Sequence, residues 1–310
     1  MTMQPVFKTL WLIIAALVIV GAGLGALGFA LGVREFVITG TGLHFLDEMG
    51  GTPAISEETS AAAFSKVRCD LGSPDVRFVT AADGTYGYRI ENSLKSEVTA
   101  AVQGDTLVIT ENSKFHFTGF NFLSTTAYCR VTITVPANVT LDSVDVNLAS
   151  GNLKTGSLDC DRMTVSAHSG DIDLTGLTAG TLSVELTSGN LKLTDTRADN
   201  LDIDLTSGDV TGNDVTYGKL DVDSTSGNVE LSGDVRDAIT LDLTSGDVQL
   251  NLTRPRSYYS KQIDTISGDV TFDGDSLSDG SYDTDATGSI RVSTTSGNVD
   301  IRFGTAATVN

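Results

Sequence analysis

Hydrophobic and polar residues alternate with a period of two through the C-terminal half of the chain, and the pattern recurs. When each repeat is numbered from the serine of a Ser-Gly pair, positions 4, 6, 14, 16 and 18 are mostly apolar. Position 4 holds Leu153, Ile172, Leu191, Val210, Val229, Val248, Val270 and Val299. Successive side chains of a strand point to opposite sides, so this period predicts strands with one inward face. We therefore expect two short strands in each repeat and no helix.

The repeats have a nearly constant length. Steps of 19 residues separate the Ser-Gly pairs at Ser150, Ser169, Ser188, Ser207, Ser226 and Ser245, and steps of 22 and 29 lead to Ser267 and Ser296. Equal coils with equal inward faces stack, so that each strand pairs with its equivalent in the next coil at about 4.8 Å. The expected fold is all-β, a single-stranded parallel β-helix of 19-residue coils. The extra residues of the long steps should bulge out as loops, one containing residues 254–259 and the other residues 273–288.

The residues around each Ser-Gly pair predict a repeated corner. Glycine adopts backbone angles closed to other residues, and serine hydroxyls can hydrogen-bond along the stack. Position 3 alternates between Asn and Asp through six coils, at Asn152, Asp171, Asn190, Asp209, Asn228 and Asp247. A column of Asp alone would place like charges side by side, which is destabilising. The alternation is therefore what a stacked column of corners should select.

The chain before the repeats divides into four segments: a tail at 1–8, an uncharged apolar run at 9–33, a stalk rich in Gly, Ser, Thr and acidic residues at 34–63, and strand-like runs at 64–135. The apolar run exceeds the roughly 20 residues that span a bilayer as a helix and is longer than the core of a cleaved signal peptide. Residues 64–135 are expected to cap the solenoid, which occupies residues 136–310. Lys8 precedes the run and acidic residues follow it, so the N-terminus should be cytoplasmic and the main domain extracellular.

Two G-x-x-x-G steps lie in the apolar run, at Gly21, Gly25, Gly28 and Gly32. This spacing lets two membrane helices approach closely, which would give a homodimer. The alternative is that glycine is simply common in membrane helices, and the sequence leaves both open.

The formal net charge of −20 opposes nucleic-acid binding, because a polyanion repels the phosphate backbone. The three cysteines cannot form a closed set of disulfides. Cys69 and Cys129 both lie in strand-like runs and are candidates for a disulfide, whereas the other interpretation is that all are buried free thiols.

Outward positions 15 and 17 carry carboxylates in successive coils, and position 17 holds Glu185, Asp204, Asp223, Asp242 and Asp264. Neighbouring carboxylates about 5 Å apart repel one another, and Ca²⁺ would offset this by taking several oxygens at once. The candidate Ca²⁺ ligands are Asp202, Asp204, Asp221 and Asp223. A solvated acidic stripe screened by salt is the competing interpretation.

No hydrolase, metalloprotease or phosphate-loop motif is present, and the repeated Ser-Gly pairs are corner residues, so the chain is not expected to be an enzyme or to need a cofactor. Tyr258, Tyr259 and Tyr282 in the two insertions are candidates for a glycan- or protein-binding surface. Local loop packing is the alternative for these tyrosines.

The run from Tyr128 to Leu153, with its strand ending at Val135-Pro136 and the Ser-Gly-Asp/Asn corners after it, resembles the bacterial putative-adhesin family. The resemblance covers roughly Phe64 to Phe303 and implies a domain of unknown function, anchored in the membrane or exported, without established catalytic residues. By analogy it also implies a right-handed β-solenoid. We expect a structural or adhesive role at the cell surface. Two alternatives stay open: a sensing or regulatory component of an envelope-stress system, and a polysaccharide-active enzyme.

Overall fold

The computed structural model describes residues 36–39, 42–45, 54–55, 59–92, 97–112 and 129–304. They belong to two units, described separately. The smaller contains the antiparallel hairpin of β1 (Phe36–Thr39) and β2 (Gly42–Phe45). The predicted tail, transmembrane helix, its four glycines and most of the stalk lie outside the described residues. Within the described part of the chain, no helix is long and apolar enough to cross a membrane.

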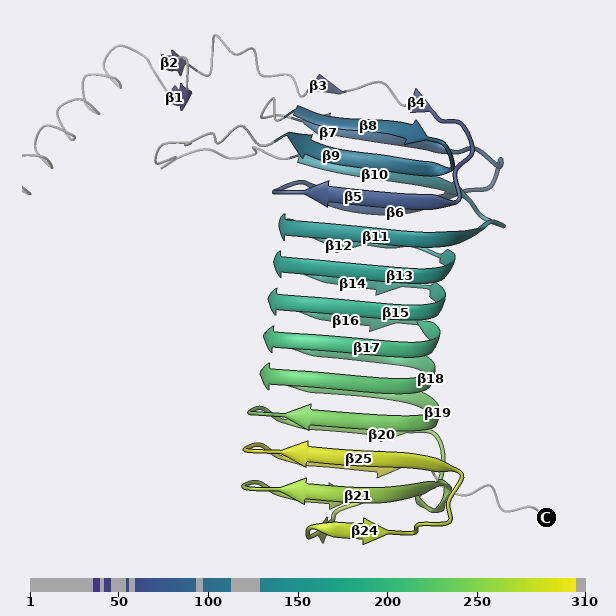
Figure 1. Cartoon of the computed structure of the whole chain (residues 1–310), viewed down its shortest axis with the longest axis vertical. Coiled ribbons are helices and arrows are strands. Elements are labelled where there is room, and N and C mark those ends of the chain that lie inside the picture. The colour runs from purple at the N-terminus through teal and green to yellow at the C-terminus, as the bar shows by residue number, and fades with distance from the viewer. Residues whose placement is uncertain are drawn as a thin grey trace, which may run out of the picture. The chain divides into compact units, whose positions relative to one another are not determined.

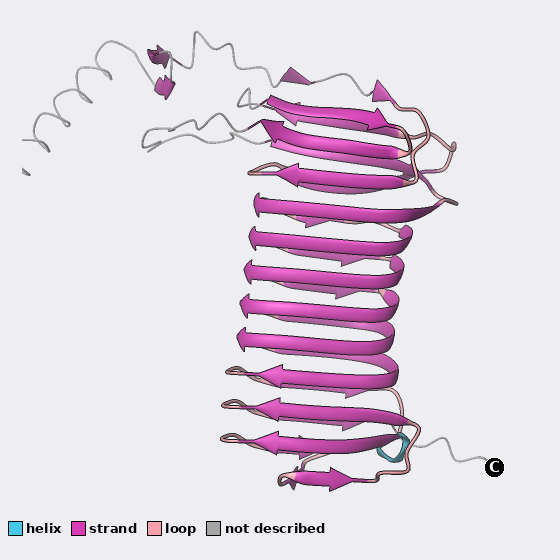
Figure 2. Ribbon diagram, in the orientation of Figure 1, coloured by secondary structure: helices cyan, strands magenta, loops and turns pink. Residues whose placement is uncertain are grey.

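The larger unit is almost entirely β-structure (Figure 2). It has one short 3₁₀ helix, η1 (Arg256–Tyr258). Its strands are β3 (Ala54–Ile55), β4 (Thr59–Ser60), β5 (Lys66–Leu71), β6 (Asp75–Ala81), β7 (Gly87–Asn92), β8 (Glu97–Gln103), β9 (Thr106–Asn112), β10 (Cys129–Pro136), β11 (Thr140–Ser150), β12 (Leu153–Lys154), β13 (Leu158–Ser169), β14 (Ile172–Thr175), β15 (Leu177–Ser188), β16 (Leu191–Thr194), β17 (Arg197–Ser207), β18 (Val210–Ser226), β19 (Val229–Leu243), β20 (Val248–Leu252), β21 (Tyr259–Thr265), β22 (Val270–Phe272), β23 (Asp275–Leu277), β24 (Gly280–Tyr282), β25 (Gly288–Thr294) and β26 (Val299–Phe303).

These strands form a stack of layers, each with two strands joined by parallel pairing to the layers above and below (Figure 1). In stacking order the layers are β9/β10, β5/β6, β11/β12, β13/β14, β15/β16, β17/β18, β18/β19, β19/β20, β25/β26 and β21/β22. The long strands β18 and β19 each turn a corner and so contribute to two layers. At about 4.8 Å per layer the stack is roughly 43 Å high.

The predicted parallel solenoid with a 19-residue register is confirmed for the central coils. Ile172, Leu191 and Val210 occupy successive layers of one column, and all three are buried. One continuous hydrophobic core, built largely from Val, Leu and Ile, runs through the stack. The inward columns predicted from the period of two therefore supply the core, as expected when each layer buries the same face against the next.

The corners form a hydrogen-bonded ladder. The backbone N–H and the Nδ2 amide of Asn190 both donate to Oδ1 of Asp171, at 3.0 and 3.1 Å. In the next layer the backbone N–H of Asp209 donates to Oδ1 of Asn190 at 3.2 Å. Asn thus supplies an extra donor to the carboxylate beside it, which a second Asp could not do. The corner requires glycine at position 208 for two reasons. The carbonyl oxygen of Gly189 would lie 1.8 Å from a Cβ added at Gly208, and the φ of Gly208 is 126°, which other residues rarely adopt.

The order of the last two coils differs from the expected sequence order. The β25/β26 layer lies between β19/β20 and β21/β22, although it follows β21/β22 in the chain. Asn298 therefore donates to Asp247, and the N–H of Asp269 donates to Asn298. The spatial column alternates without a break, as Asp75, Asn152, Asp171, Asn190, Asp209, Asn228, Asp247, Asn298 and Asp269. Sequence order would have placed Asp247 and Asp269 together, with two carboxylates and no amide between them.

The insertions also differ from the expected outward loops. In the second insertion, β23 and β24 pair antiparallel with β22 and β21 and cover the outer edge of the terminal layer. At the other end, β8 and β7 pair antiparallel with β9 and β10 in the same way. Cys69 and Cys160 are buried free thiols and Cys129 is also buried, so the candidate disulfide between Cys69 and Cys129 is absent. Burial raises the pKa of Cys69 and Cys160 to about 12, which makes both thiols weak nucleophiles.

The layer order can be tested by engineered disulfides. Gln249 is in register with Asp300 in the neighbouring layer, and Asp300 is in register with Thr271 in the layer beyond. We expect the double variant Gln249→Cys/Asp300→Cys to form a disulfide, because a neighbouring layer at about 4.8 Å lies within disulfide range. The control pair Gln249→Cys/Thr271→Cys spans two layers and should stay reduced. Mass spectrometry of the oxidised proteins distinguishes them, and cross-linking of the control pair alone would show that the coils stack in sequence order.

The ladder predicts that replacing one of its Asn residues by Asp lowers the stability of the fold. Asn190→Asp should lower the free energy of unfolding at pH 7 by about 1–2 kcal/mol, because it removes a donor and sets three carboxylates in a row. The loss should shrink as the pH falls, since protonation of the new carboxyl restores a donor. Denaturant unfolding at pH 7 and pH 4 measures both effects. The control Asn200→Asp, with Thr181 and Lys219 as register neighbours, should cost much less; equal losses would mean that the ladder contributes nothing specific.

Candidate ligand-binding groove

Carboxylates form two adjacent columns on the outer surface of four central layers. Glu185, Asp204, Asp223 and Asp242 lie in one register column, contributed by β15, β17, β18 and β19. Asp202 and Asp221 are neighbours in the second column. The strands place them there because outward residues alternate with buried ones such as Ile203 and Val222. We call the first set the acidic column.

Beside the acidic column runs a shallow groove of about 390 Å³. Its other side is formed by threonines at the position before each corner serine, namely Thr187, Thr206, Thr225, Thr244 and Thr295. We call these the threonine column. The column extends to Thr295 because the β25 layer follows the β19 layer in space, which puts Thr295 after Thr244. The groove thus offers carboxylates along one wall and hydroxyls along the other, both repeating once per layer.

The carboxylates raise one another's pKa. Partial burial raises the pKa of Asp223 above its usual value, and the negative charges of Asp242 and Asp204 raise it further. The pKa of Asp204 is raised by partial burial and then by Asp202 and Glu185. Asp221 shifts in the same direction for the same reasons. The groove therefore concentrates negative charge that its own layers do not neutralise, and a cation from solution would relieve it.

The acidic column ends where the layer order changes. Sequence spacing adds Asp264 after Asp242, but in the structure Ser293 is the register neighbour of both. The predicted Ca²⁺ ligands Asp202, Asp204, Asp221 and Asp223 do come together in two neighbouring layers. However, no group of three acidic, histidine or cysteine side chains in the described part of the chain is arranged to hold a metal ion. The carboxylates stand side by side along a surface, and calcium binding to them stays a prediction.

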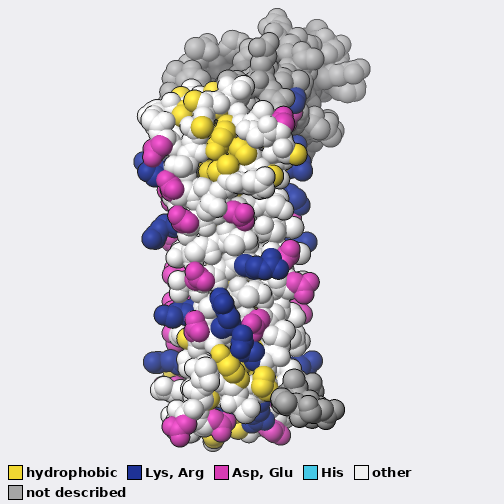
Figure 3. Space-filling model, turned by 90° about the vertical axis from the view of Figure 1, so that its right-hand side faces the viewer, with side chains coloured by type: hydrophobic (Ala, Val, Ile, Leu, Met, Phe, Trp, Pro, Cys, Tyr) yellow, Lys and Arg dark blue, Asp and Glu magenta, His cyan; other side chains and the backbone are white. Residues whose placement is uncertain are grey.

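The opposite side of the stack has a different charge pattern. Figure 3, which shows the right-hand side of Figure 1, has Lys and Arg side chains interspersed with Asp and Glu. Ion pairs between acidic and basic residues include Arg197 at the start of β17 with Asp195 at 2.8 Å and Arg236 within β19 with Asp199 at 3.7 Å. These charges compensate one another locally, whereas the carboxylates of the acidic column have no basic partner in the lining of the groove.

The predicted tyrosine surface is not a common surface. Tyr259 is completely buried at the start of β21 and donates its hydroxyl to the carbonyl of Val235. Tyr258 and Tyr282 are half-buried, and each also donates to a backbone carbonyl, Arg236 at 2.9 Å and Ser278 at 2.8 Å. All three hydroxyls are therefore used within the fold. Tyr259 would have to leave the core to contact a ligand, so the surface proposed from the sequence is wrong for this residue.

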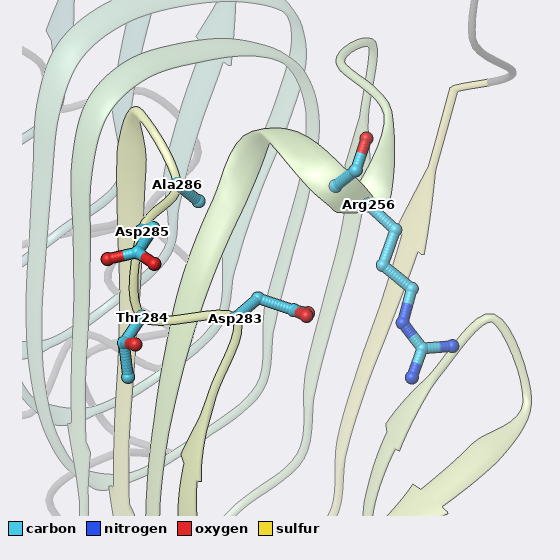
Figure 4. Close-up of a pocket in the computed structure, with 6 residues that line it drawn as sticks. Arg256, Asp283, Thr284, Asp285 and Ala286 are labelled. Atoms are coloured by element: carbon cyan, nitrogen blue, oxygen red, sulfur yellow. The ribbon is translucent and has the colours of Figure 1, made fainter.

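A second hollow, of about 730 Å³, lies near the insertions between Arg256 and residues 283–286 (Figure 4). Two of its charged groups, Arg256 and Asp283, already have partners in the protein. Arg256 donates to the Asp275 carboxylate at 2.7 Å and to the Phe272 carbonyl at 3.1 Å, and Asp283 binds the buried ammonium of Lys261 at 2.5 Å. A ligand there would compete with these bonds, so the acidic groove is the better candidate.

The described residues show no hydroxyl nucleophile beside a histidine base. His168 replaces threonine at one corner of β13, and no hydroxyl of the described residues is hydrogen-bonded to a histidine. The groove has carboxylates and hydroxyls without a basic partner in its lining. Its chemistry is suited to holding a ligand by charge and hydrogen bonds.

A family model described as Toastrack DUF4097 matches residues 64–302. The chain belongs to the Toastrack DUF4097 family. The predicted relation to a bacterial putative-adhesin domain of unknown function is thereby confirmed. The Toastrack region begins just before β5 and ends within β26, so it contains the whole stack of layers.

The Toastrack fold of this chain is similar to several solved structures. A putative adhesin from Bacteroides fragilis is 16% identical, with 82% of this chain and 98% of that chain covered and a TM-score of 0.42. A putative adhesin from Parabacteroides distasonis is 15% identical, with 82% and 98% covered and a TM-score of 0.42. A putative lipid binding protein from the same species is 14% identical, with 83% and 98% covered and a TM-score of 0.33. No curated protein matches the chain.

Repulsion within the acidic column can be measured directly. Asp223→Asn should raise the free energy of unfolding at pH 7 by about 0.5 kcal/mol, because it removes one of several adjacent like charges. Since the folded-state pKa of Asp223 is raised, its carboxylate destabilises the fold above that pKa, and the gain should disappear as the pH falls below it. Urea unfolding between pH 3 and pH 7, at low and high salt, checks the size and screening of the effect.

The matched control for this measurement is Asp264→Asn. Asp264 belongs to the same sequence position, but Ser293 separates it from Asp242. We expect a clearly smaller change at pH 7. Equal stabilisation by the two substitutions would contradict both the layer order and the local origin of the repulsion.

Proposed function

We propose that this Toastrack protein is a non-catalytic surface protein, anchored in the cell membrane by residues 9–33, whose β-solenoid stands outside the cell and binds an extended ligand along the acidic groove. The relation of the Toastrack domain to bacterial putative adhesins supports a surface-associated role. The uncharged apolar run and the distribution of flanking charge support the anchor and its orientation.

The observation that carries the proposal is the pairing of two continuous columns. The acidic column and the threonine column face one groove over several layers and repeat together at about 4.8 Å. A ligand that matches this repeat could form the same contacts in each layer, and many weak contacts would add to a useful affinity. This geometry favours a linear polymer over a compact small molecule.

The chemistry of the two walls narrows the polymer class. Carboxylates select positive charge, and threonine hydroxyls donate to and accept from other hydroxyls. A polysaccharide of aminosugars with free amino groups has both features, because it presents ammonium and hydroxyl groups along its whole length. An extended basic peptide has charges but lacks the hydroxyls, and its side chains on one face recur at about 6.8 Å, which does not match the layers.

Binding can be tested with the full chain in lipid nanodiscs. Oligomers of β-1,4-linked glucosamine should bind, whereas fully N-acetylated oligomers of the same length should bind at least tenfold more weakly, because they lack the ammonium groups. The double variant Asp204→Asn/Asp223→Asn should weaken binding of the charged oligomer about tenfold, which corresponds to about 1.4 kcal/mol. Calorimetric titration at two salt concentrations measures these differences.

The control variant for binding is again Asp264→Asn, which lies beyond the end of the acidic column. It should leave the affinity unchanged. Equal binding of charged and acetylated oligomers, or equal loss in both variants, would contradict the groove as the binding surface. A failure to bind any polymer, together with a stoichiometric membrane-protein partner in a pull-down, would favour a sensing or regulatory role.

A further inference from the structure

The chain does not run from layer to layer at either end of the stack. At the N-terminal end it first forms β5/β6, then the outermost layer β9/β10, and then passes β5/β6 to form β11/β12. At the C-terminal end it goes from β19/β20 to the outermost layer β21/β22 and then returns to form β25/β26 inside it. The two ends therefore have the same arrangement with opposite chain direction.

As a result, the two layers from which the chain continues toward its termini, β5/β6 and β25/β26, each lie between two other layers. β5 pairs with β9 on one edge and β11 on the other, and Lys66 is in register with both Thr106 and Ser143. β25 pairs with β19 and β21, and β26 pairs with β20 and β22. In a solenoid stacked in sequence order the terminal coil would have one free edge and could separate one hydrogen bond at a time.

The outermost layers depend on the enclosed ones. Through their parallel edges β9 and β10 pair with β5 and β6, whereas their other partners, β8 and β7, belong to the same end segment. Removing β5/β6 would therefore detach β9/β10 from the rest of the stack. The same holds at the other end, where β21/β22 is joined to the stack through β25/β26.

Side-chain bonds fasten each crossing connection. At the N-terminal end, Ser65 Oγ donates to the Asp142 carboxylate at 2.7 Å, and the N–H of Asp142 donates to the Ser65 carbonyl at 2.7 Å. The N–H of Ala137 donates to the carbonyl of Ala81 at 3.0 Å. These bonds tie the start of the connection after β10 and the first residues of β11 to the two ends of the β5/β6 layer.

At the C-terminal end a buried lysine has this role. Lys261 on β21 points inward, is 2% exposed, and donates to the Tyr259 carbonyl at 2.8 Å. It also binds the carboxylate of Asp283, which lies in the connection from β24 to β25. The ion pair lowers the pKa of Asp283, which keeps it charged against the ammonium. The terminal layer and its return connection are thus held together by a charge contact whose cationic side is buried.

We infer that each end of the stack unfolds as one unit, residues 64–139 at one end and residues 253–304 at the other. We call these two units clasps. They let the solenoid carry tension along its axis. A force on the N-terminal segment acts first on β3 and β4, which pair with β7 of the same end segment, and then on β5, which can leave only after both of its edges break. A force on the C-terminal segment acts on β26 in the same way. A protein that links a membrane to an external ligand experiences such tension, but the inference rests on the pairing of the ends and holds whatever the ligand is.

Magnetic tweezers on the full chain, tethered at Met1 and Asn310, test this inference. The two end units should release as single steps of about 75 and 50 residues, which lengthen the chain by roughly 250 and 170 Å. Peeling of single coils from the ends would instead give first steps of about 19 residues, or roughly 65 Å, and would overturn the inference.

Two variants assign the steps to the clasps. Asp142→Ala, at an exposed side chain, should lower the force of the longer step only, whereas Asp283→Asn should lower that of the shorter step only. Thermal unfolding followed by circular dichroism establishes that both variants are folded before the measurement. If a variant lowers the unfolding force of both steps, or of neither, then these contacts do not hold the ends of the stack.

Discussion

The hydrogen-bonded stacking of the Ser-Gly-Asp/Asn corners is the constraint on which the rest of the structure depends. From Gly170 onward, each corner glycine lies against the carbonyl of the glycine in the neighbouring layer, so that no Cβ would fit, and each Asn or Asp bonds to its neighbour in the column. These contacts fix the register of the layers that carry the Ser-Gly corner. Because the register is fixed, inward positions form one core and outward positions form straight columns.

The sequence was sufficient to predict the central part of the fold. The 19-residue step, the period of two and the corner residues together specify parallel layers, because each of these features must agree with its copies above and below. The position of Ile172 beneath Leu191 follows directly from this repeat. The N-terminal layers were less accessible, since β5/β6 and β9/β10 lack the Ser-Gly corner and could be assigned only to a cap.

The stacking order of the last coils is also encoded in the sequence, in the alternation of Asn and Asp at the corners. Alternation of Asn and Asp breaks after Asp247 in the sequence, and it is restored only when Asn298 is placed before Asp269. The two insertions make this break hard to interpret, because extra residues between two Ser-Gly pairs are normally explained by a loop. Tyr259 was assigned to a loop surface for the same reason, although it begins strand β21 and fills the core. The candidate groove was therefore only partly predictable: its carboxylates follow from the repeat, but its end at Ser293 follows from the layer order.

The position of the β25/β26 layer between β19/β20 and β21/β22 affects the corner ladder, the acidic groove and the end of the stack at the same time. Sequence order would place Asp269 after Asp247, Asp264 after Asp242 and Ile266 after Thr244. All three juxtapositions are unfavourable for the proposed roles: the first two add adjacent like charges, and the third replaces a hydroxyl of the groove by an exposed apolar side chain. Insertion of β25/β26 puts Asn298, Ser293 and Thr295 in those places instead. One topological change therefore satisfies the corner ladder, limits the repulsion in the acidic column, extends the threonine column by a layer and encloses the strand that leads to the C-terminus.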